Sequence, residues 1–448
     1  MRKALTLDNF MDGLKRRNPR EPEFHQAVYE VAKSLVPFIR KHPEYRHAQI
    51  LERMTQPDRV ISFRVCWHDD KANIRTNQGF RIQFNNAIGP YKGGLRFHRD
   101  LNLSVLKFLG FEQTFKNSLT TLPLGAAKGG ADFNPKGKSD NEVMRFCQAY
   151  MTELARYLGP HVDVPAGDGG VGSREIAYLF GQYKRLTHQF DGALTGKPIP
   201  LGGSLVRSEA TGYGCAYFMM QVLEHRQQTI EGKTCVLSGA GNVALFCAEK
   251  LIESGARVVS LSDTSGFVHA ADGLTREQLR EIKEHKLQRR EPLAKLGKQL
   301  KLKFHKGKQP WGLDCELAFP CASQNEIGVE EAKQLVKSGC QALAEGANMP
   351  VTPDAYEVFA DAGVVFVPGK AANAGGVAVS GLEMSQNRVG MHWTAAEVDQ
   401  HLRDIMAKIH EQCLEHSPGR SKSVDYVRGA NIAGFIKVAD AMLAYGVV

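Results

Sequence analysis

Hydrophobic residues recur at helical spacing over residues 22–40 and 102–118, and they alternate with polar residues over residues 59–66 and 79–87. The first pattern predicts two amphipathic helices, and the second predicts two half-buried strands. The first part of the chain is therefore expected to mix helices and strands, and it contains no obvious repeat.

The start of a further helix is marked by its own residues. Ser139 and Glu142 are spaced as a capping box directly before the run MRFCQAYMTELARYL, which has helical apolar spacing. In a capping box each side chain bonds to the backbone N–H of the other residue, and this satisfies donors that a helix start leaves unpaired. The pattern predicts that a helix begins at this serine.

The pattern changes at DGALTGKPIPLGGS, residues 191–204, which is rich in glycine and proline and predicts a domain boundary. Beyond it, KTCVLSGAGNVALFCAEKLIESGARVVSLSD predicts a buried strand, a glycine turn, a helix and a second strand. CELAFP, CQALAEG and VVFVPG alternate with helical segments and extend a parallel sheet to about residue 368.

The fold class predicted from these patterns is α/β, with two domains. Residues 1–202 form the first domain, and residues 203–424 form a Rossmann-like, doubly wound domain. The stretch 425–448 contains NIAGFIKVADAMLAYG and predicts a helix that packs back on the first domain.

Composition agrees with a globular protein of more than one domain. The chain has 448 residues, of which 43% are hydrophobic and 23% are charged. Its nine cysteines are scattered and never spaced CxxC, which argues against a disulfide framework and indicates a reducing compartment. Without an apolar leader or an 18-residue apolar run, we expect a cytoplasmic protein with no membrane span.

The net charge of +9 raises the question of nucleic acid. The basic residues are spread along the chain, with only short clusters such as Lys15–Arg17 and Lys301–Lys308 and no aromatic residues interleaved in a basic motif. This distribution predicts a solvated surface that favours anionic small molecules, and no nucleic-acid partner.

Gly239, Gly241 and Ala244 spell GxGxxA between a predicted strand and a predicted helix, and this context indicates a dinucleotide fingerprint. The first glycine permits the tight turn, the second lets a pyrophosphate approach the backbone, and the alanine allows the helix to pack closely on the sheet. We therefore expect a nicotinamide coenzyme on the second domain.

The residues alone leave the choice of coenzyme open. Asp263 ends the second predicted strand, where an acid bonds the ribose hydroxyls of NAD. Lys286, Arg289 and Arg290 follow soon after and are able to surround the 2′-phosphate of NADP.

Other chemical motifs are incomplete. GKS at residue 137 and GKT at residue 232 lack the earlier glycine of a P-loop, and HEQCLEH at residue 410 spaces its histidines too far apart for a helical zinc pair. We expect no metal site.

Three lysines of the first domain stand among glycines or apolar residues. Lys92 lies in PYKGGLRFH, Lys116 in GFEQTFKNSL and Lys128 in LPLGAAKGG, and Gln113 shares a predicted helix face with Lys116. A lysine that is desolvated among other cations has a lowered pKa and exchanges protons near neutral pH.

An acid accompanies these lysines. Asp168 lies in VDVPAGDGGVG, on a loop after a short predicted strand, and Gly167 before it exposes a backbone N–H to a ligand. A carboxylate beside a lysine of lowered pKa is able to relay protons.

Several long stretches together resemble one family. PYKGGLRFH, GFEQTFKNSLTTLPLGAAKGG, DVPAGDGGVG, EATGYG, GAGNVA, ELAFPCASQNEI, AEGANMP and GKAANAGGVAVSGLEMSQN occur in the order found in the hexameric glutamate dehydrogenases of the bacterial NADP-using type. The similarity runs essentially from end to end. The family often has glycine where this chain has Ala126 and Ala127, but the lysine that follows is in place.

The resemblance implies a role for each candidate residue. For the substrate it implies that Lys128 activates water, that Asp168 shuttles protons, that Lys92 and Ser380 bind the side-chain carboxylate, and that Gln113, Lys116 and the Gly167 backbone hold the α-carboxylate. For the coenzyme it implies contacts from Thr211, Asn242, Asn348 and Asn373.

The same resemblance implies the reaction and the assembly. The expected activity is the reversible oxidative deamination of L-glutamate to 2-oxoglutarate and ammonium, in a cleft between a substrate-binding and oligomerisation domain and the dinucleotide-binding domain. It favours NADP over NAD, with Lys286 and Arg289 near the 2′-phosphate, and it implies a homohexamer.

Two alternatives remain distinguishable from the residues. Dehydrogenases of leucine, valine or phenylalanine resemble this architecture but are shorter and have apolar residues at the positions of Lys92 and Ser380. A non-catalytic protein that senses nucleotides or binds nucleic acid would be expected to lack Lys128 or Asp168, and both are present.

Overall fold

A computed structural model describes residues 5–289, 291–297, 299–417 and 424–448, and the chain divides into two compact units. The first unit comprises Met1–Arg207, Val379–Val398 and Asn431–Val448, and the second comprises Ser208–Ala378 and Asp399–Ala430. Residues of three late helices are shared between the units: α14 (Gly375–Val389), α15 (Ala395–Glu415) and α16 (Tyr426–Tyr445).

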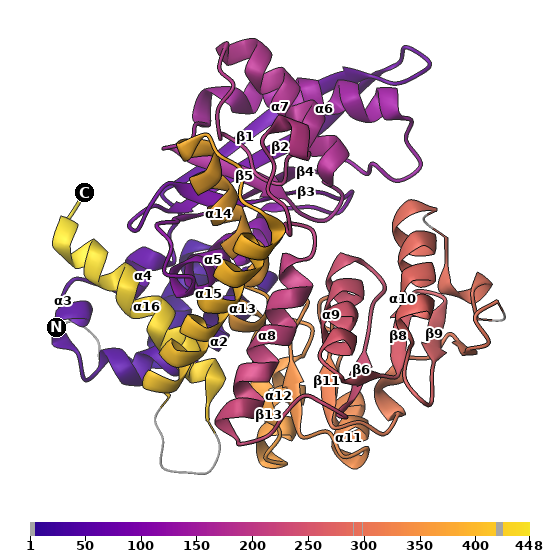
Figure 1. The fold of residues 1–448 in the computed structure, drawn as a ribbon. Coiled ribbons are helices and arrows are strands. Elements are labelled where there is room, and N and C mark those ends of the chain that lie inside the picture. The colour runs from indigo at the N-terminus through magenta and orange to yellow at the C-terminus, as the bar shows by residue number, and fades with distance from the viewer. Residues whose placement is uncertain (1–4, 290, 298, 418–423) are drawn as a thin grey trace. The chain divides into compact units, whose positions relative to one another are not determined.

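The first unit surrounds a mixed sheet (Figure 1). Its strands are β1 (Arg59–His68), β2 (Ile74–Asn85), β3 (Tyr91–Phe97), β4 (Ala126–Ala131) and β5 (Asp163–Gly167). Its remaining helices are α1 (Leu7–Arg17), α2 (Pro22–Ile39), α3 (Pro43–His47), α4 (Ile50–Met54), α5 (Leu103–Leu119), α6 (Asp140–Leu154) and α7 (Ser173–Thr187). The strand order is β1-β2-β4-β3-β5, and β2 runs antiparallel to both of its neighbours.

Helices pack on both faces of this sheet. On one face, Leu95 and Phe97 of β3 join a core with residues of α6 and α7, in which the rings of Phe133 and Phe146 stack 3.7 Å apart. On the other face, α5 lies close to β2, because a Cβ added at Gly110 would be 2.8 Å from the Phe84 ring. Burial of these apolar rings supplies much of the stability of the unit.

The predicted elements of this unit are confirmed. The helices expected at 22–40 and 102–118 are α2 and α5, the strand expected at 59–66 lies in β1, and the strand expected at 79–87 overlaps β2, which ends at Asn85. The Ser139 hydroxyl accepts the Glu142 N–H at 3.1 Å, and the glutamate accepts the serine N–H at 3.2 Å, so the capping box forms as predicted.

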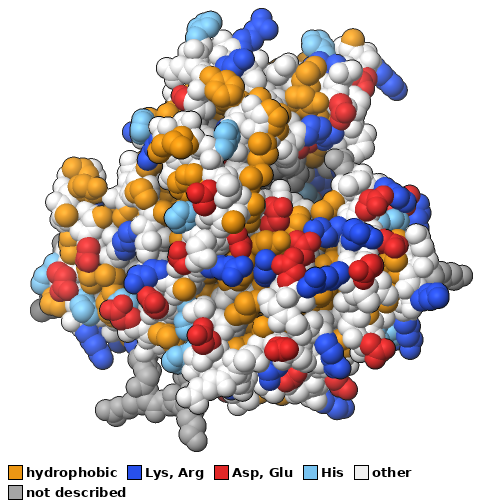
Figure 2. Space-filling view, in the orientation of Figure 1, with side chains coloured by type: hydrophobic (Ala, Val, Ile, Leu, Met, Phe, Trp, Pro, Cys, Tyr) orange, Lys and Arg blue, Asp and Glu red, His pale blue; other side chains and the backbone are white. Residues whose placement is uncertain are grey.

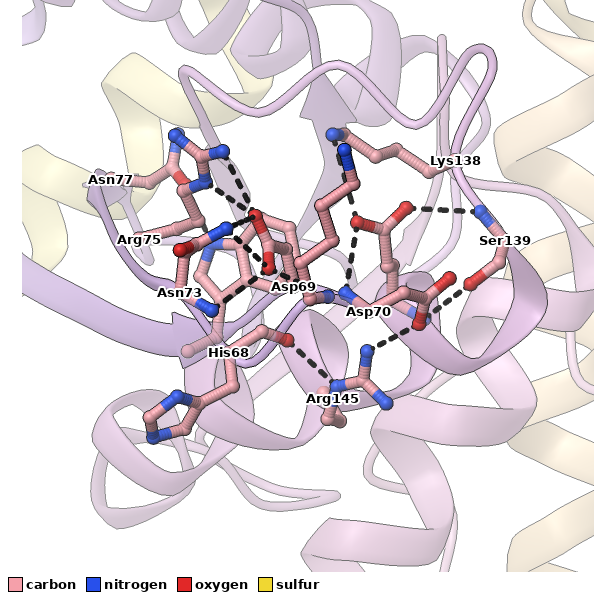
Figure 3. A network of polar contacts seen from close by, with 12 residues as sticks. His68, Asp69, Asp70, Asn73, Arg75, Asn77, Lys138, Ser139 and Arg145 are labelled. Atoms are coloured by element: carbon pink, nitrogen blue, oxygen red, sulfur yellow. Dashed lines mark hydrogen bonds and ion pairs between the residues drawn. The ribbon is translucent and has the colours of Figure 1, made fainter.

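A polar network joins the β1–β2 turn to the start of α6 (Figure 3). Asp69 accepts backbone N–H groups from Lys71 and Asn73, each at 2.9 Å, and this closes the turn. Arg145 of α6 donates to the His68 carbonyl at 2.7 Å. Because these groups satisfy one another, the network fixes the hairpin and does not present a ligand site.

The second unit is built on a parallel sheet of order β13-β12-β11-β6-β7 and an antiparallel sheet of order β10-β9-β8. The strands are β6 (Thr234–Leu237), β7 (Arg257–Val258), β8 (Ser260–Asp263), β9 (Gly266–His269), β10 (Lys303–Lys306), β11 (Leu317–Phe319), β12 (Ala342–Ala344) and β13 (Val365–Val367). The helices are α8 (Ala210–His225), α9 (Asn242–Glu253), α10 (Arg276–Lys283), α11 (Val329–Lys337), α12 (Pro353–Asp361) and α13 (Gly369–Ala372). The parallel sheet expected to reach about residue 368 is confirmed by β13.

The predicted second strand of this unit is divided, which corrects the sequence prediction. Only Arg257–Val258 pairs with β6, whereas Ser260–Asp263 belongs to the antiparallel sheet. The cause is a side chain: the Ser260 hydroxyl accepts the Leu237 N–H at 3.1 Å and donates to the Leu237 carbonyl at 3.0 Å. It therefore takes the place of the backbone groups that would have continued the ladder.

Basic and acidic side chains are interspersed on the face drawn in Figure 2. No single basic surface covers that face. Within the described ranges, no helix combines the length and apolar character needed to cross a membrane.

Candidate active site

Lys128 and Asp168 meet in the first unit. Lys128 lies on β4, and its Nζ is 2.7 Å from Oδ2 of Asp168, which follows β5 directly. Arg96 of β3 brings its Nε to 3.2 Å from the same oxygen. The lysine side chain is 5% exposed and the aspartate side chain 22%, so the carboxylate bridges two cations where the site opens to solvent.

Glycine at position 94 makes this meeting possible. Leu95 pairs with Gly129 across β3 and β4, so Gly94 and Lys128 lie on the same face of the sheet. A Cβ at Gly94 would lie 2.8 Å from the Asp168 Cβ and 3.4 Å from the Lys128 Nζ. Any larger residue would separate the amine from the carboxylate.

The protonation of the pair is shifted by its surroundings. Burial lowers the pKa of Lys128, and Arg96 and Arg81 lower it further, while Asp168 opposes them. Burial alone would raise the pKa of Asp168, but Arg96 and Lys128 more than offset it and hold that pKa well below its usual range. Asp168 is therefore an anion at neutral pH, beside an amine that loses its proton more easily than a surface lysine.

A second buried lysine lies in a cluster of polar and charged side chains. Lys92 of β3 is 1% exposed, and its Nζ donates to the Thr195 hydroxyl at 2.8 Å. The Thr195 N–H donates to the Pro165 carbonyl at 2.9 Å. Arg207 donates from Nε to the Ser380 hydroxyl at 2.8 Å. Two cations and two hydroxyls are thus gathered, as the recognition of a carboxylate requires.

The surroundings of Lys92 disfavour the charged form of its amine. Burial lowers the pKa of Lys92 well below its usual value, and Arg207 and Arg81 lower it further. Glu383 and Asp163 oppose this effect. An added anion at the pocket would favour the charged amine, so the pocket is prepared for a negatively charged group.

A buried ion pair connects the segment that carries Thr195 to the helix that carries Ser380. Glu383 of α14 accepts from Lys197 Nζ at 2.8 Å and from the Gly196 N–H at 2.9 Å, and the two charged side chains are 0% and 1% exposed. Gly196 follows Thr195 directly, and Glu383 lies one turn after Ser380. The stretch that the sequence marked as a boundary therefore also carries part of the pocket.

The remaining substrate candidates lie around the same strands. Gln113 of α5 donates to Asn117 Oδ1 at 2.6 Å, and Asn117 donates to the Lys92 carbonyl at 3.1 Å. Lys116 is half-buried on the same helix, and Gly167 ends β5 immediately before the catalytic aspartate candidate. All seven substrate-site candidates belong to the first unit.

The dinucleotide fingerprint lies in the second unit, where the carboxyl ends of β6 and β11 are adjacent. Gly239 has φ +86°, a conformation that glycine adopts without strain, and a Cβ there would lie 3.0 Å from the Cys321 carbonyl. Ala244 is fully buried beneath the turn. Among the described residues, apart from the chain neighbours of Gly241, no heavy atom lies within 4 Å of a Cβ built at this glycine, which directly precedes α9, so this helix start has room for a phosphate.

Thr211 and Asn242 come from the two helices that flank this turn. A Cβ at Gly212 would lie 2.4 Å from the Cys247 N, so the backbones of α8 and α9 are in contact. Thr211 precedes that contact, and Asn242 is the first residue of α9.

Asn348 and Asn373 are bonded to each other. Asn373 donates from Nδ2 to Asn348 Oδ1 at 3.1 Å. The Asn373 Oδ1 is buried and has no hydrogen-bond partner among the described residues. An unpaired buried acceptor is costly, and an amide N–H from a ligand would satisfy it.

Asp263 is already occupied by donors. Its Oδ2 accepts from Lys286 Nζ at 2.7 Å and from the Leu293 N–H at 2.8 Å, while Oδ1 accepts the Ser265 N–H at 2.9 Å. Burial would raise the pKa of Asp263, but Lys286 and the other donors lower it overall. The acid is therefore neutralised by the lysine that the sequence proposed for phosphate binding.

The other basic candidates differ from this lysine. Arg289 is exposed, and its Nη2 donates to Glu284 Oε1 at 2.7 Å and not to Asp263. Arg290 lies outside the described residues.

Sequence reasoning missed Arg96, Thr195 and Arg207 as members of the site. Arg96 carried a local signal, because it lies two residues after Gly94 and alternation puts it on the face of Lys92. Thr195 and Arg207 had none, since both come from loops whose course depends on tertiary contacts.

The two units, the fingerprint turn and the lysine–aspartate pair together define an amino-acid dehydrogenase architecture. The family model for glutamate/leucine/phenylalanine/valine dehydrogenase matches residues 202–446, and the model for the dimerisation domain of Glu/Leu/Phe/Val dehydrogenases matches residues 57–185. The chain belongs to the Glu/Leu/Phe/Val dehydrogenase family.

Among the members of this family, the chain is similar to several glutamate dehydrogenases. The chain is 53% identical over 448 residues to an NADP-specific glutamate dehydrogenase of Escherichia coli, covering 100% of both chains. It is 53% identical over 437 residues to an NAD(P)-specific glutamate dehydrogenase of Xylanibacter ruminicola, covering 98% of each. The crystal structure of Plasmodium falciparum glutamate dehydrogenase superposes with a TM-score of 0.96 at 49% identity, over 99% of this chain and 95% of that one.

The buried amine of Lys92 generates a prediction about stability. Its pKa is lowered on folding, so the unfolded chain binds more protons than the folded one, and stability rises with pH until the ordinary lysine pKa is reached. Lys92→Met removes this cost. We expect a higher thermal unfolding midpoint than the parent at pH 7, with the gap closing towards about pH 10.4.

Calorimetry at several pH values measures this gap, and Lys136→Met is the control because Lys136 is exposed. A gap that does not change with pH would show that the Lys92 charge carries no folding cost.

Proposed function

We propose that the protein catalyses the reversible oxidative deamination of L-glutamate to 2-oxoglutarate and ammonium with NADP(H). The observation that carries this proposal is the contact of the buried Lys128 amine with Asp168, next to a second buried lysine in a pocket for an anion. The names of the full-length relatives support the same reaction. The protein is an NADP-dependent oxidoreductase of the glutamate dehydrogenase type.

Each end of the dianionic substrate has its own cations. Lys92 and Ser380 bind the side-chain carboxylate, with Arg207 beside them. Gln113, Lys116 and the Gly167 backbone hold the α-carboxylate. Holding both ends fixes the α-carbon relative to Lys128, and this positioning supplies part of the rate enhancement.

Lys128 and Asp168 divide the proton transfers. The chemistry that a bound NADP⁺ would supply is the acceptance of a hydride from the substrate α-carbon. Lys128, as a neutral amine, takes a proton from the water that attacks this carbon, and Asp168 carries protons to and from the departing nitrogen. The lowered pKa of Lys128 supports its role as a base. The 2.7 Å contact between Lys128 Nζ and Asp168 Oδ2 supports the role of the aspartate, because it lets a proton pass directly between the two groups.

The second unit holds the coenzyme. Gly239, Gly241, Asn242 and Ala244 receive the pyrophosphate at the start of α9, with Thr211 beside them. Asn348 and Asn373 bind the nicotinamide amide, which would pair the buried Asn373 Oδ1.

The preference for NADP(H) over NAD(H) is supported by Asp263. An acid that is already bonded to Lys286 does not offer a free carboxylate to ribose hydroxyls. Lys286 and Arg289 each bond a carboxylate and keep further N–H donors for a 2′-phosphate.

Assembly and location complete the proposal. The match to a dimerisation domain supports self-association, and the family resemblance supports a cytoplasmic homohexamer. Size-exclusion chromatography with light scattering measures the subunit number.

The direct test is oxidation of NADPH and, separately, of NADH in the presence of 2-oxoglutarate, with and without ammonium. We expect an ammonium-dependent rate that is higher with NADPH. Absence of ammonium dependence with either coenzyme would rule out the proposed reaction.

Asp168→Asn tests the proton shuttle, because it keeps the shape of the side chain and removes the exchangeable charge. We expect turnover to fall by about 10² to 10⁴, the usual range for a lost acid–base group. NADPH binding, followed by its fluorescence, should survive because Asp168 belongs to the first unit. Near-normal turnover would refute this role for the aspartate.

Lys92→Leu, alone or with Ser380→Val, tests how the side-chain carboxylate is recognised. Losing a charge-assisted contact should cost about 2 to 4 kcal/mol, or roughly 30-fold to 1000-fold in kcat/KM for glutamate. Activity on norvaline should fall much less, because norvaline lacks that carboxylate. Equal losses on both substrates would mean that Lys92 does not contact it.

Lys286→Gln and Arg289→Gln, made separately, test the coenzyme preference. Lys286 is partly buried against Asp263, whereas Arg289 is exposed, so we expect the larger rise in the NADPH KM from Lys286→Gln. NADH kinetics should change little in either variant, since NADH has no 2′-phosphate. If the parent enzyme prefers NADH, Asp263 is the selecting residue instead.

A further inference from the structure

A second buried ion pair lies in the first unit and takes no part in the mechanism above. Arg81 of β2 and Asp163 of β5 are each 0% exposed. Arg81 Nε donates to Asp163 Oδ2 at 3.0 Å, and Nη2 bonds to the other carboxylate oxygen. Gln83 also donates to Asp163, at 3.0 Å. Since β4 and β3 lie between β2 and β5 in the sheet, the pair spans two intervening strands.

The Arg81 side chain lies on the face of the sheet opposite to the catalytic lysine candidate. Ile82 pairs with Lys128 across β2 and β4, so these two share a face and Arg81 lies on the other. A Cβ at Gly129 would lie 3.0 Å from Arg81 Cδ, so glycine at this position leaves the space through which the arginine crosses β4.

Asp163 and the arginine also fix the strand that carries the second lysine. Lys92 pairs with Val164, so Asp163 lies on the face opposite to Lys92. Arg81 Nη1 donates to the Gly93 carbonyl at 3.1 Å, and Asn117 donates to the Lys92 carbonyl from α5 at 3.1 Å. Two successive carbonyls of β3 are therefore bonded to side chains from different elements.

The pair acts on the lysines electrostatically as well as through the backbone. Burial is the main cause of the lowered pKa values of Lys92 and Lys128, and Arg81 lowers both further, whereas Asp163 raises that of Lys92. The charged groups that act on Lys128 are Asp168 and Arg96 on its own face of the sheet and Arg81 on the opposite face. Those that act on Lys92 are Arg207 and Glu383, together with Arg81 and Asp163 on the opposite face. Arg81 is the member common to both sets.

We propose that Arg81 and Asp163 are a positioning pair that holds β3 beneath the substrate and places one fixed cation behind both lysines. The inference deepens the proposed function and rests on it for the role of Lys128. Buried ion pairs can often be replaced by well-packed apolar residues without loss of stability. If the pair served stability alone, its replacement would leave the titration of Lys128 unchanged.

Three single variants separate the charge from the contact. Arg81→Gln removes the cation and leaves Asp163 unpaired, so Lys128 should keep its proton to higher pH and the acidic limb of kcat for glutamate oxidation should move to higher pH. Asp163→Asn leaves Arg81 uncompensated, so the limb should move to lower pH. Arg81→Lys keeps the charge but loses the two-pronged contact, so kcat/KM should fall while the limb stays in place.

A double variant guards against misfolding of the singles, since an unpaired buried charge is strongly destabilising. Arg81→Met with Asp163→Leu removes both charges, and its limb should move to higher pH, because Arg81 acts on Lys128 more strongly than Asp163 does. The inference is overturned if the limb of this double variant stays at its parental position. Shifts of Arg81→Gln and Asp163→Asn in the same direction would overturn it as well.

A readout that needs no turnover separates this inference from the proposed function. Acetylation of Lys128 by acetic anhydride, relative to the exposed Lys136, is followed by mass spectrometry across pH in the parent and in each variant. The Lys128 titration should move as the kinetic limb does. If the parent oxidises no glutamate and the titration still moves, the proposed function fails alone; a fixed titration overturns the positioning role.

Discussion

The burial of two lysine amines is the constraint on which the rest of the first unit depends. Lys92 and Lys128 are almost out of contact with water, and an ammonium group in such surroundings is strongly disfavoured unless other charges compensate. Asp168 compensates at one amine, and Glu383 and Asp163 do so in part at the other. The compensation is incomplete, and this leaves amines that release protons readily and pockets that gain from an incoming anion. If other charges fully compensated both amines, the site would be more stable, but the amines would keep their protons.

The glycines of β3 and β4 serve the same constraint on both faces of the sheet. At Gly94 the absence of a side chain lets an amine and a carboxylate meet on one face, and at Gly129 it lets an arginine cross the sheet on the other. Glycine in a strand costs backbone entropy and contributes no packing. Large aromatic residues around these strands, such as Phe97, Phe133 and Phe146, supply apolar burial nearby. Rigid packing around the glycines keeps the charged groups at fixed distances.

Local patterns were sufficient to predict α2, α5 and α6, the capping box and the fingerprint turn, because each depends on neighbours in sequence. The parallel sheet was predicted from the alternation of strands and helices along the chain. The site was predicted where chemistry was concentrated in a motif, as for Lys128 among small residues. Arg207 and Glu383 were not predicted, because they come from segments far apart in the chain, and only the tertiary fold brings Arg207 to Ser380 and Glu383 to Lys197. The division of the second strand was missed for a related reason: a single hydroxyl, that of Ser260, replaces a backbone ladder.

The order in which the two units are encoded has a consequence for synthesis. The first unit is completed by Asn431–Val448, which leaves the ribosome only after the whole second unit. In that late stretch, the Gly434 carbonyl accepts the Ser118 hydroxyl of α5 at 2.8 Å, and Asp440 accepts the Tyr45 hydroxyl at 2.7 Å. Until then a nascent chain carries the lysine-bearing sheet with part of its helical layer missing. Domains usually fold in the order in which they leave the ribosome, but here the first unit is completed by a segment that is made after the second unit. The time spent in this half-covered state is when the newly made protein most needs protection from aggregation.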